Sequence, residues 1–135
     1  MANPTINATL GALVTAETAL GRVLAVKFDK DGGAKLRYHV AKLARLVAAE
    51  TRHYYEERDG LVKRYGENGQ IAPASPRWGA FLDALKEIAD VPTTIAWAPI
   101  TEAMIAPYPD ITAADLIALG PLFELDPPAA GEAAT

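Results

Sequence analysis

The chain has 135 residues, of which half are hydrophobic and 22% are charged, and its formal net charge at pH 7 is −4. This length fits one domain with a small core. The absence of cysteine excludes disulfides, thiolate metal ligands and a cysteine nucleophile. No apolar run is long enough for a transmembrane helix, and the first residues lack the features of a signal peptide. We therefore expect the chain to be made in the cytoplasm of its cell.

The charge is distributed unevenly along the chain. Residues 1–75 carry eleven Lys or Arg against eight Asp or Glu, whereas residues 76–135 carry two against nine. Either the two halves fold onto each other and partly neutralise, or the molecule stacks head to tail with copies of itself or with a partner. An acidic chain with scattered lysines is a poor candidate for nucleic-acid binding.

The first predicted helix spans residues 8–25, after a loose arm over residues 1–6. Asn7 can cap this helix, because an Asx side chain accepts from the free N–H groups of a first turn. One face of the helix is apolar and consists of Leu10, Leu13, Val14, Leu20, Val23 and Leu24. Residues 26–33 then form a turn, since Asp31-Gly32-Gly33 accepts positive φ.

The longest predicted element is a helix over residues 34–65. This stretch contains no proline, and large or semi-apolar side chains recur in it every three or four residues, which is the period of one helix face. The residues of this stripe are Leu36, Val40, Leu43, Val47, Thr51, Tyr54, Arg58, Leu61 and Tyr65. Such a helix is about 48 Å long, so the rest of the chain must be organised around it. Gly66 fits the position just past its end.

A third helix is predicted over residues 76–90, with Ser75 as its cap and Pro76 in its first turn. The stretch from Val91 to Ile100 alternates in the manner of an extended strand, and Gln70–Ala72 can pair with it in a two-stranded sheet. Thr112, with Asp115 three residues later, caps a last helix over residues 112–119. The apolar side of this helix is formed by Leu116, Ile117 and Leu119.

Together these elements predict a mainly α fold. The first two helices, at 8–25 and 34–65, form a long helical hairpin, and the helices at 76–90 and 112–119 form a smaller C-terminal cap. Residues 1–125 make one domain, and residues 126–135 are too polar and proline-rich to pack and are predicted to be a disordered tail.

Tests for catalytic and metal chemistry are mostly negative. His39 and His53 lie about 21 Å apart on one helix, too far for a shared metal. His53 and Glu57 could offer two ligands, but no third is evident, so we expect a simple hydrogen-bonding pair. The run from Asp29 to Gly32 lacks the end ligands of a calcium loop. We expect no enzyme activity, cofactor or metal.

Four side chains are the candidates for contact with a protein partner: Arg37, Arg45, Tyr55 and Trp97. The two arginines belong to a cationic group on the first half of the long helix, where the helix dipole prefers anions. Either the acidic C-terminal half or a partner should compensate this charge. Exposed tyrosine and tryptophan side chains mark interfaces, although such residues more often pack inside their own chain.

The order of these parts resembles a family of small proteins encoded by tailed phages and prophages. The likeness covers most of residues 9–125, and its strongest pieces are the run EERDGLVKRYGE and the closing ITAADLIAL, which is similar to the family's I-T-P-A-D-L pattern. Ala113 stands where relatives have proline, and the FDKDGG turn replaces a shorter, proline-containing one. The family has no assigned activity, so the resemblance implies origin and architecture.

Two functions follow as hypotheses. The first is a non-enzymatic phage structural or interaction protein, which docks its helix surfaces onto other phage proteins or onto copies of itself, in the virion or in the host cytoplasm. The second is a small infection-stage effector that binds and inhibits a host protein, with its acidic half imitating nucleic-acid charge.

Overall fold

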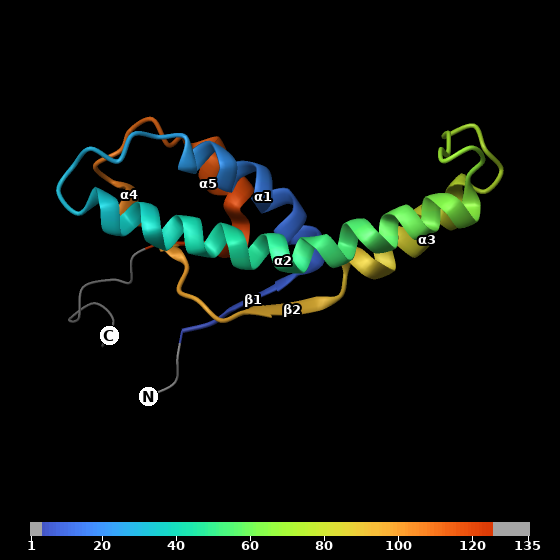
Figure 1. The fold of residues 1–135 in the computed structure, drawn as a ribbon, viewed down its shortest axis with the longest axis horizontal. Coiled ribbons are helices and arrows are strands. Elements are labelled where there is room, and N and C mark those ends of the chain that lie inside the picture. Colours follow the sequence, from blue (N-terminus) through green and yellow to red (C-terminus); the bar gives the residue numbers. More distant parts are fainter. Residues whose placement is uncertain (1–3, 126–135) are drawn as a thin grey trace, which may run out of the picture.

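The computed structural model describes residues 4–125. It is mostly helical and contains one long helix, two small two-stranded sheets and a short C-terminal helix (Figure 1). The expectation of a mainly α protein organised around one long helix is therefore confirmed. The predicted tail at residues 126–135 lies outside the described residues.

The helix α2 (Gly33–Tyr65) is unbroken over its 33 residues. Its predicted apolar stripe is buried only in the first half, at Leu36, Val40, Leu43, Val47 and Thr51. Beyond Thr51 the stripe continues with half-buried residues. The reason is length, because the helix that covers α2 from one side, α1 (Leu10–Leu24), has only 15 residues.

The helix α1 begins two residues later than predicted, and its cap is Thr9, not Asn7. Thr9 Oγ1 accepts a hydrogen bond from the Ala12 N–H at 3.2 Å. Gly11 lies against α3 (Trp78–Ala89), where an added Cβ would stand 3.0 Å from the Cβ of Ala89. A glycine is therefore used where two helices approach closely. The main core forms between α1, the first half of α2 and the C-terminal segment.

The loop between α1 and α2 is held in place by glycine and by Tyr108. Gly32 has a φ of 80°, which a side chain would strain. Gly33 is buried, and a side chain there would clash with the main-chain carbonyl of Phe28. The Tyr108 hydroxyl accepts from the Lys30 N–H at 3.3 Å, and its ring meets that of Phe28 edge-on at 5.2 Å.

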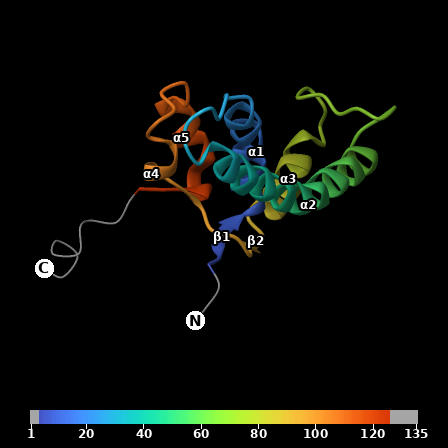
Figure 2. The ribbon, with the colours of Figure 1, turned by 60° about the vertical axis from the view of Figure 1, so that its left-hand side comes forward.

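The loose arm predicted over residues 1–6 is wrong at its last residue, because Ile6 belongs to a strand. Ile6–Thr9 is a strand, β1, which pairs antiparallel with β2 (Pro92–Ile95), so that Ile6 lies opposite Ile95. The predicted pairing of the stretch from Val91 to Ile100 with Gln70–Ala72 was therefore wrong. In the views of Figures 1 and 2, this sheet lies on the opposite side of α2 from α1 and α5 (Ala113–Leu119). Both isoleucines point into the core and are buried.

Gln70, the first residue of the predicted partner strand, closes a turn that reverses the chain after α2, and Ile71 and Ala72 belong to no strand. Asn68 and Gly69 both have positive φ, at 55° and 75°, and Glu67 and Gln70 exchange two main-chain hydrogen bonds around them. An Asn-Gly pair favours such a two-residue reversal, and Gln70 therefore pairs with Glu67 across the turn and not with the stretch from Val91 to Ile100. Gly66 follows α2 as predicted, but its φ is −100°. A side chain there would clash with the Gln70 carbonyl.

The third helix, α3 (Trp78–Ala89), is shorter than predicted, and its N-cap position is Arg77. Ser75 Oγ accepts from the Arg77 N–H at 3.2 Å, so the predicted cap residue organises the turn before the helix. Phe81 is the only buried residue of α3. We call residues 52–89 the arm, because α3 and the second half of α2 pack on each other and extend away from the rest (Figure 1).

The C-terminal segment contains β3 (Ile100–Thr101), α4 (Glu102–Ile105), α5 (Ala113–Leu119), the short 3₁₀ turn η1 (Gly120–Leu122) and β4 (Phe123–Glu124). The strands β3 and β4 pair in parallel. The predicted capping box of α5 is present, because Thr112 and Asp115 each accept from the other's main-chain N–H. Ile117, however, is 80% exposed. Asp115 and Leu119 face inward instead, since α5 turns its capping carboxylate toward α1.

Candidate protein-interaction surface

Within residues 4–125, no group of three metal-binding side chains comes together. Among the same residues, no helix combines the length and the apolar character that are needed to cross a bilayer. His39 packs its ring against Trp97, with ring centroids 5.3 Å apart, and its Nε2 lies 3.3 Å from the Pro99 carbonyl oxygen. His53 is exposed on α2.

Trp97 lies outside β2 and packs across the first half of α2. Its Nε1 donates to the main-chain carbonyl of His39 at 3.1 Å. The ammonium nitrogen of Lys42 lies 4.5 Å from the centroid of the indole ring, a cation–π contact. The ring of Tyr38 meets the indole edge-on at 6.4 Å. The extended segment after β2 is therefore fixed to α2 by the half-buried side chain of Trp97 and by the contact of His39 with the Pro99 carbonyl.

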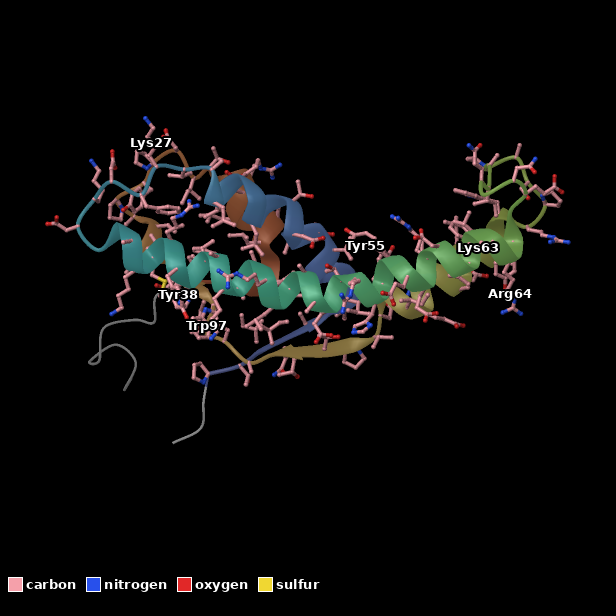
Figure 3. The ribbon with its side chains drawn as sticks, in the orientation of Figure 1. Lys27, Tyr38, Tyr55, Lys63, Arg64 and Trp97 are labelled. Atoms are coloured by element: carbon pink, nitrogen blue, oxygen red, sulfur yellow. The ribbon has the colours of Figure 1, made fainter. Side chains whose placement is uncertain are left out.

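These contacts create a surface that is both aromatic and basic. Tyr38 is 57% exposed although it is a large ring, and Figure 3 shows it beside Trp97. Arg45 is exposed seven residues after Tyr38, which places it on the same face of α2. We call Tyr38, Lys42, Arg45 and Trp97 the Tyr38–Trp97 patch. A hollow of about 320 Å³ adjoins it, lined by Lys35, His39 and Met104 among others.

The cations of this patch lack acidic partners among residues 4–125. The ion pairs of that range involve neither Lys42 nor Arg45. The first turn of α2 contains no acidic residue, and its N-cap, Gly32, offers no side chain. The acidic C-terminal half was one of two expected sources of compensation, and within the described range it forms no ion pair with these two cations.

The other two predicted contact residues lie elsewhere and are used inside the chain. Arg37 Nη1 donates to the carbonyl of Leu24 at 3.2 Å and so binds the end of α1. The Tyr55 hydroxyl donates to Glu17 Oε1 at 3.0 Å, and the guanidinium of Arg58 lies 4.9 Å from the centroid of its ring. The structure therefore places Arg45 and Trp97 on the same face of α2, whereas Arg37 and Tyr55 make contacts elsewhere.

Glu17 joins α1 to α2 through both oxygens of its carboxylate. Oε2 accepts from the hydroxyl of Thr51, which is almost fully buried, at 2.9 Å, while Oε1 accepts from Tyr55. Burial and the hydrogen bond to Glu17 raise the pKa of the Tyr55 phenol above its ordinary value of 10.0. No local sequence pattern indicates this role of Glu17, because its partners come from another helix.

A second polar link joins α1 to α5. Arg22 Nε donates to Asp115 Oδ1 at 2.6 Å. This hydrogen bond, together with that from the Thr112 main-chain N–H, holds the pKa of the Asp115 carboxyl below its ordinary value of 3.8. The capping motif revealed Asp115, but no local signal indicates Arg22.

No family model, curated protein or solved structure matches the chain.

Proposed function

We propose that the chain is a non-enzymatic interaction protein of a tailed phage, which docks onto another phage protein through the Tyr38–Trp97 patch. In this proposal α1 and α2 act as a helical hairpin and the C-terminal helices as its cap, which together hold the patch in place. The observation that carries the proposal is the patch itself. Two large rings and two cations share one face of α2, and neither cation has an acidic partner in residues 4–125.

The composition of the patch suits a protein partner with an acidic surface. Tyrosine, tryptophan and arginine are the residues that most often dominate binding energy at interfaces, because each combines a large contact area with a polar group. Trp97 is already fixed by its hydrogen bond to His39, so little conformational entropy is lost when a partner covers it. Lys42 and Arg45 favour carboxylates on that partner, both by direct attraction and by steering the encounter.

The phage origin rests on the resemblance of the EERDGLVKRYGE and ITAADLIAL runs and is part of the proposal. Mass spectrometry of particles purified from cells that produce the phage tests it. We expect the chain in the particle, in stoichiometric amount, or bound to a head or tail protein in the lysate. Absence from both would contradict the proposal.

Variants of the patch test which surface is used. Tyr38→Ala combined with Arg45→Glu should lower recovery of the partner at least tenfold without unfolding the chain, because both side chains are exposed. Arg77→Glu is the matched control, since it makes the same charge change at an exposed position before α3. Equal recovery for the patch variant and this control would show that the patch is not the docking surface.

The effector role remains the alternative. It predicts one stoichiometric, salt-sensitive partner captured from host lysate, with no recovery in particles. The basic character of the patch favours binding to an acidic protein surface. Imitation of nucleic acid would instead use the acidic residues 76–125 for the contact.

A further inference from the structure

The second half of α2 carries two pairs of charges placed symmetrically about a glycine. Glu56 and Glu57 precede Gly60 by four and three residues, while Lys63 and Arg64 follow it by three and four. At 3.6 residues per turn, all four side chains lie within about 60° of the direction of Gly60. All five positions are exposed. We call this surface the Gly60 face. Leu61 and Tyr65, which are half-buried, lie about 100° and about 140° around the helix from Gly60 and so outside this face.

The fold of a single chain gives no reason for glycine at position 60. A Cβ there would meet no atom within 4 Å, and Gly60 is absent from the residues with positive φ. A glycine inside a helix costs about 1 kcal/mol relative to alanine. Where neither a turn nor a neighbour within the chain requires it, glycine allows another backbone to approach closely.

We propose that a second copy of this chain docks on the Gly60 face, so that two α2 helices cross antiparallel at Gly60 about a two-fold axis. Glu56 and Glu57 of each copy then face Arg64 and Lys63 of the other, which gives four charge pairs from one pattern. The order of the charges along α2 favours an antiparallel second copy over other partners. A partner must present the reverse order, basic then acidic, and an antiparallel copy of α2 does so by symmetry, whereas a parallel copy would oppose like charges.

Contacts inside the chain do not prevent this exchange. Arg52 Nε lies 3.8 Å from Glu56 Oε1, and both side chains are mostly exposed. The guanidinium of Arg64 lies 5.4 Å from the centroid of the Tyr65 ring. At an exposed surface such pairs contribute little, whereas charges of opposite sign between two closely packed helices attract more strongly because the effective dielectric constant there is lower. Figure 3 shows Lys63 and Arg64 on the part of α2 that extends beyond α1 and the β1–β2 sheet, where another molecule has room to approach.

This inference rests on the proposed function, because it names one partner for an interaction protein. It uses a different surface from the Tyr38–Trp97 patch, so a dimer can still present both of its patches to another protein. The interface is polar, and we therefore expect its affinity to fall with salt.

Sedimentation equilibrium of the full chain tests the inference. We expect a monomer–dimer equilibrium at low salt that shifts toward monomer at high salt. The double variants E56K/E57K and K63E/R64E should each be monomeric, because each gives the face a single sign of charge. An equimolar mixture of the two should form a heterodimer, and the chain carrying all four changes should dimerise again. Dimers unaffected by these reversals would overturn the inference.

Variants at the crossing point separate the interface from stability. Gly60→Leu should weaken association at least tenfold, while its urea unfolding midpoint stays equal or rises, because leucine favours the helix. Gly79→Leu is the control, since Gly79 is an exposed glycine of α3 with no atom within 4 Å of an added Cβ, and it should leave association unchanged.

Failure of this inference is distinguishable from failure of the proposed function. A wild-type chain that is monomeric at all concentrations, or whose Gly60 face captures a different protein, overturns the dimer. If that monomer is nonetheless found in particles, the proposed function stands. A charge-dependent dimer that is absent from particles and from phage protein complexes contradicts the proposed function and supports the dimer.

Discussion

Arg22 and Asp115 lie 93 residues apart in the chain, and the Arg22 Nε donates to Asp115 Oδ1 at 2.6 Å. The second oxygen of the same carboxylate accepts from the main-chain N–H of Thr112 at 3.1 Å. One side chain therefore both caps α5 and joins it to α1. This double use gives the carboxylate a stronger effect on the fold than its place in a seven-residue helix suggests.

Acid should weaken the link between α1 and α5. The folded pKa of Asp115 is lowered below 3.8 by Arg22 and Thr112, so its stabilising effect is complete above about pH 4 and is lost as the pH falls through the lower folded value. Urea unfolding of wild type and Asp115→Asn should therefore differ at pH 7 and converge in strong acid. The control is Asp83→Asn, an exposed carboxylate of α3, which should change stability little at either pH.

Removal of the Tyr55 hydroxyl should destabilise the contact between α1 and α2. Tyr55→Phe keeps the ring and deletes the hydrogen bond to Glu17, which ordinarily costs about 1 kcal/mol. Tyr38→Phe, at an exposed ring, should cost much less. The pKa of Tyr55 is raised, so the stability that the neutral phenol provides is present below about pH 10 and is lost as the pH rises through the folded value. Ultraviolet titration should show one late tyrosine that Tyr55→Phe removes.

Two helical glycines, Gly21 of α1 and Gly33 of α2, should respond in opposite ways to replacement by alanine. Gly33→Ala should lower the unfolding free energy by about 1–3 kcal/mol, because its methyl group would meet the Phe28 carbonyl and the Tyr108 hydroxyl. Gly21→Ala in α1, where a Cβ meets nothing within 4 Å, should raise it by up to about 1 kcal/mol. Thermal and urea unfolding measure both, and equal effects would contradict the packing seen around the α1–α2 loop.

The arm should open independently of the rest of the chain. Phe81→Ala removes the one buried side chain of α3 and should cost about 3 kcal/mol, whereas Leu82→Ala, at a side chain that is 42% exposed, should cost much less. Hydrogen exchange by mass spectrometry should show faster exchange in Phe81→Ala within residues 52–89, while α1 and the first half of α2 remain protected. Uniform acceleration over the whole chain would show that the arm is part of one cooperative unit.

Local patterns predicted the long helix well and the sheets poorly. The spacing of three and four residues between apolar positions from Leu36 to Tyr65 was enough to predict the start of α2 to within one residue. The strand β1 gave no comparable signal, because Ile6–Thr9 has four residues and only Ile6 of them is buried. Its partner lies nearly ninety residues away, and such distant pairings leave no trace in a short window of sequence.

The candidate surface was predictable by residue type but not by arrangement. Arg45 and Trp97 were expected at an interface because of their chemistry, and the structure places both in the patch. Tyr38 was missed because its role depends on where the segment after β2 crosses α2. The cap at Thr112 could be recognised from four consecutive residues, whereas the Arg22 contact depends on how α1 and α5 pack.

The pairing of Ile6 with Ile95 has a consequence for synthesis of the chain. During translation β1 is made well before its partner strand, because Ile95 follows Ile6 by nearly ninety residues. Until residue 95 has left the ribosomal exit tunnel, Ile6 has no strand to lie against, and part of the apolar surface of α1 and α2 has nothing to cover it. Completion of the fold must therefore wait for β2, and a nascent chain stalled before that point would be a natural substrate for chaperones.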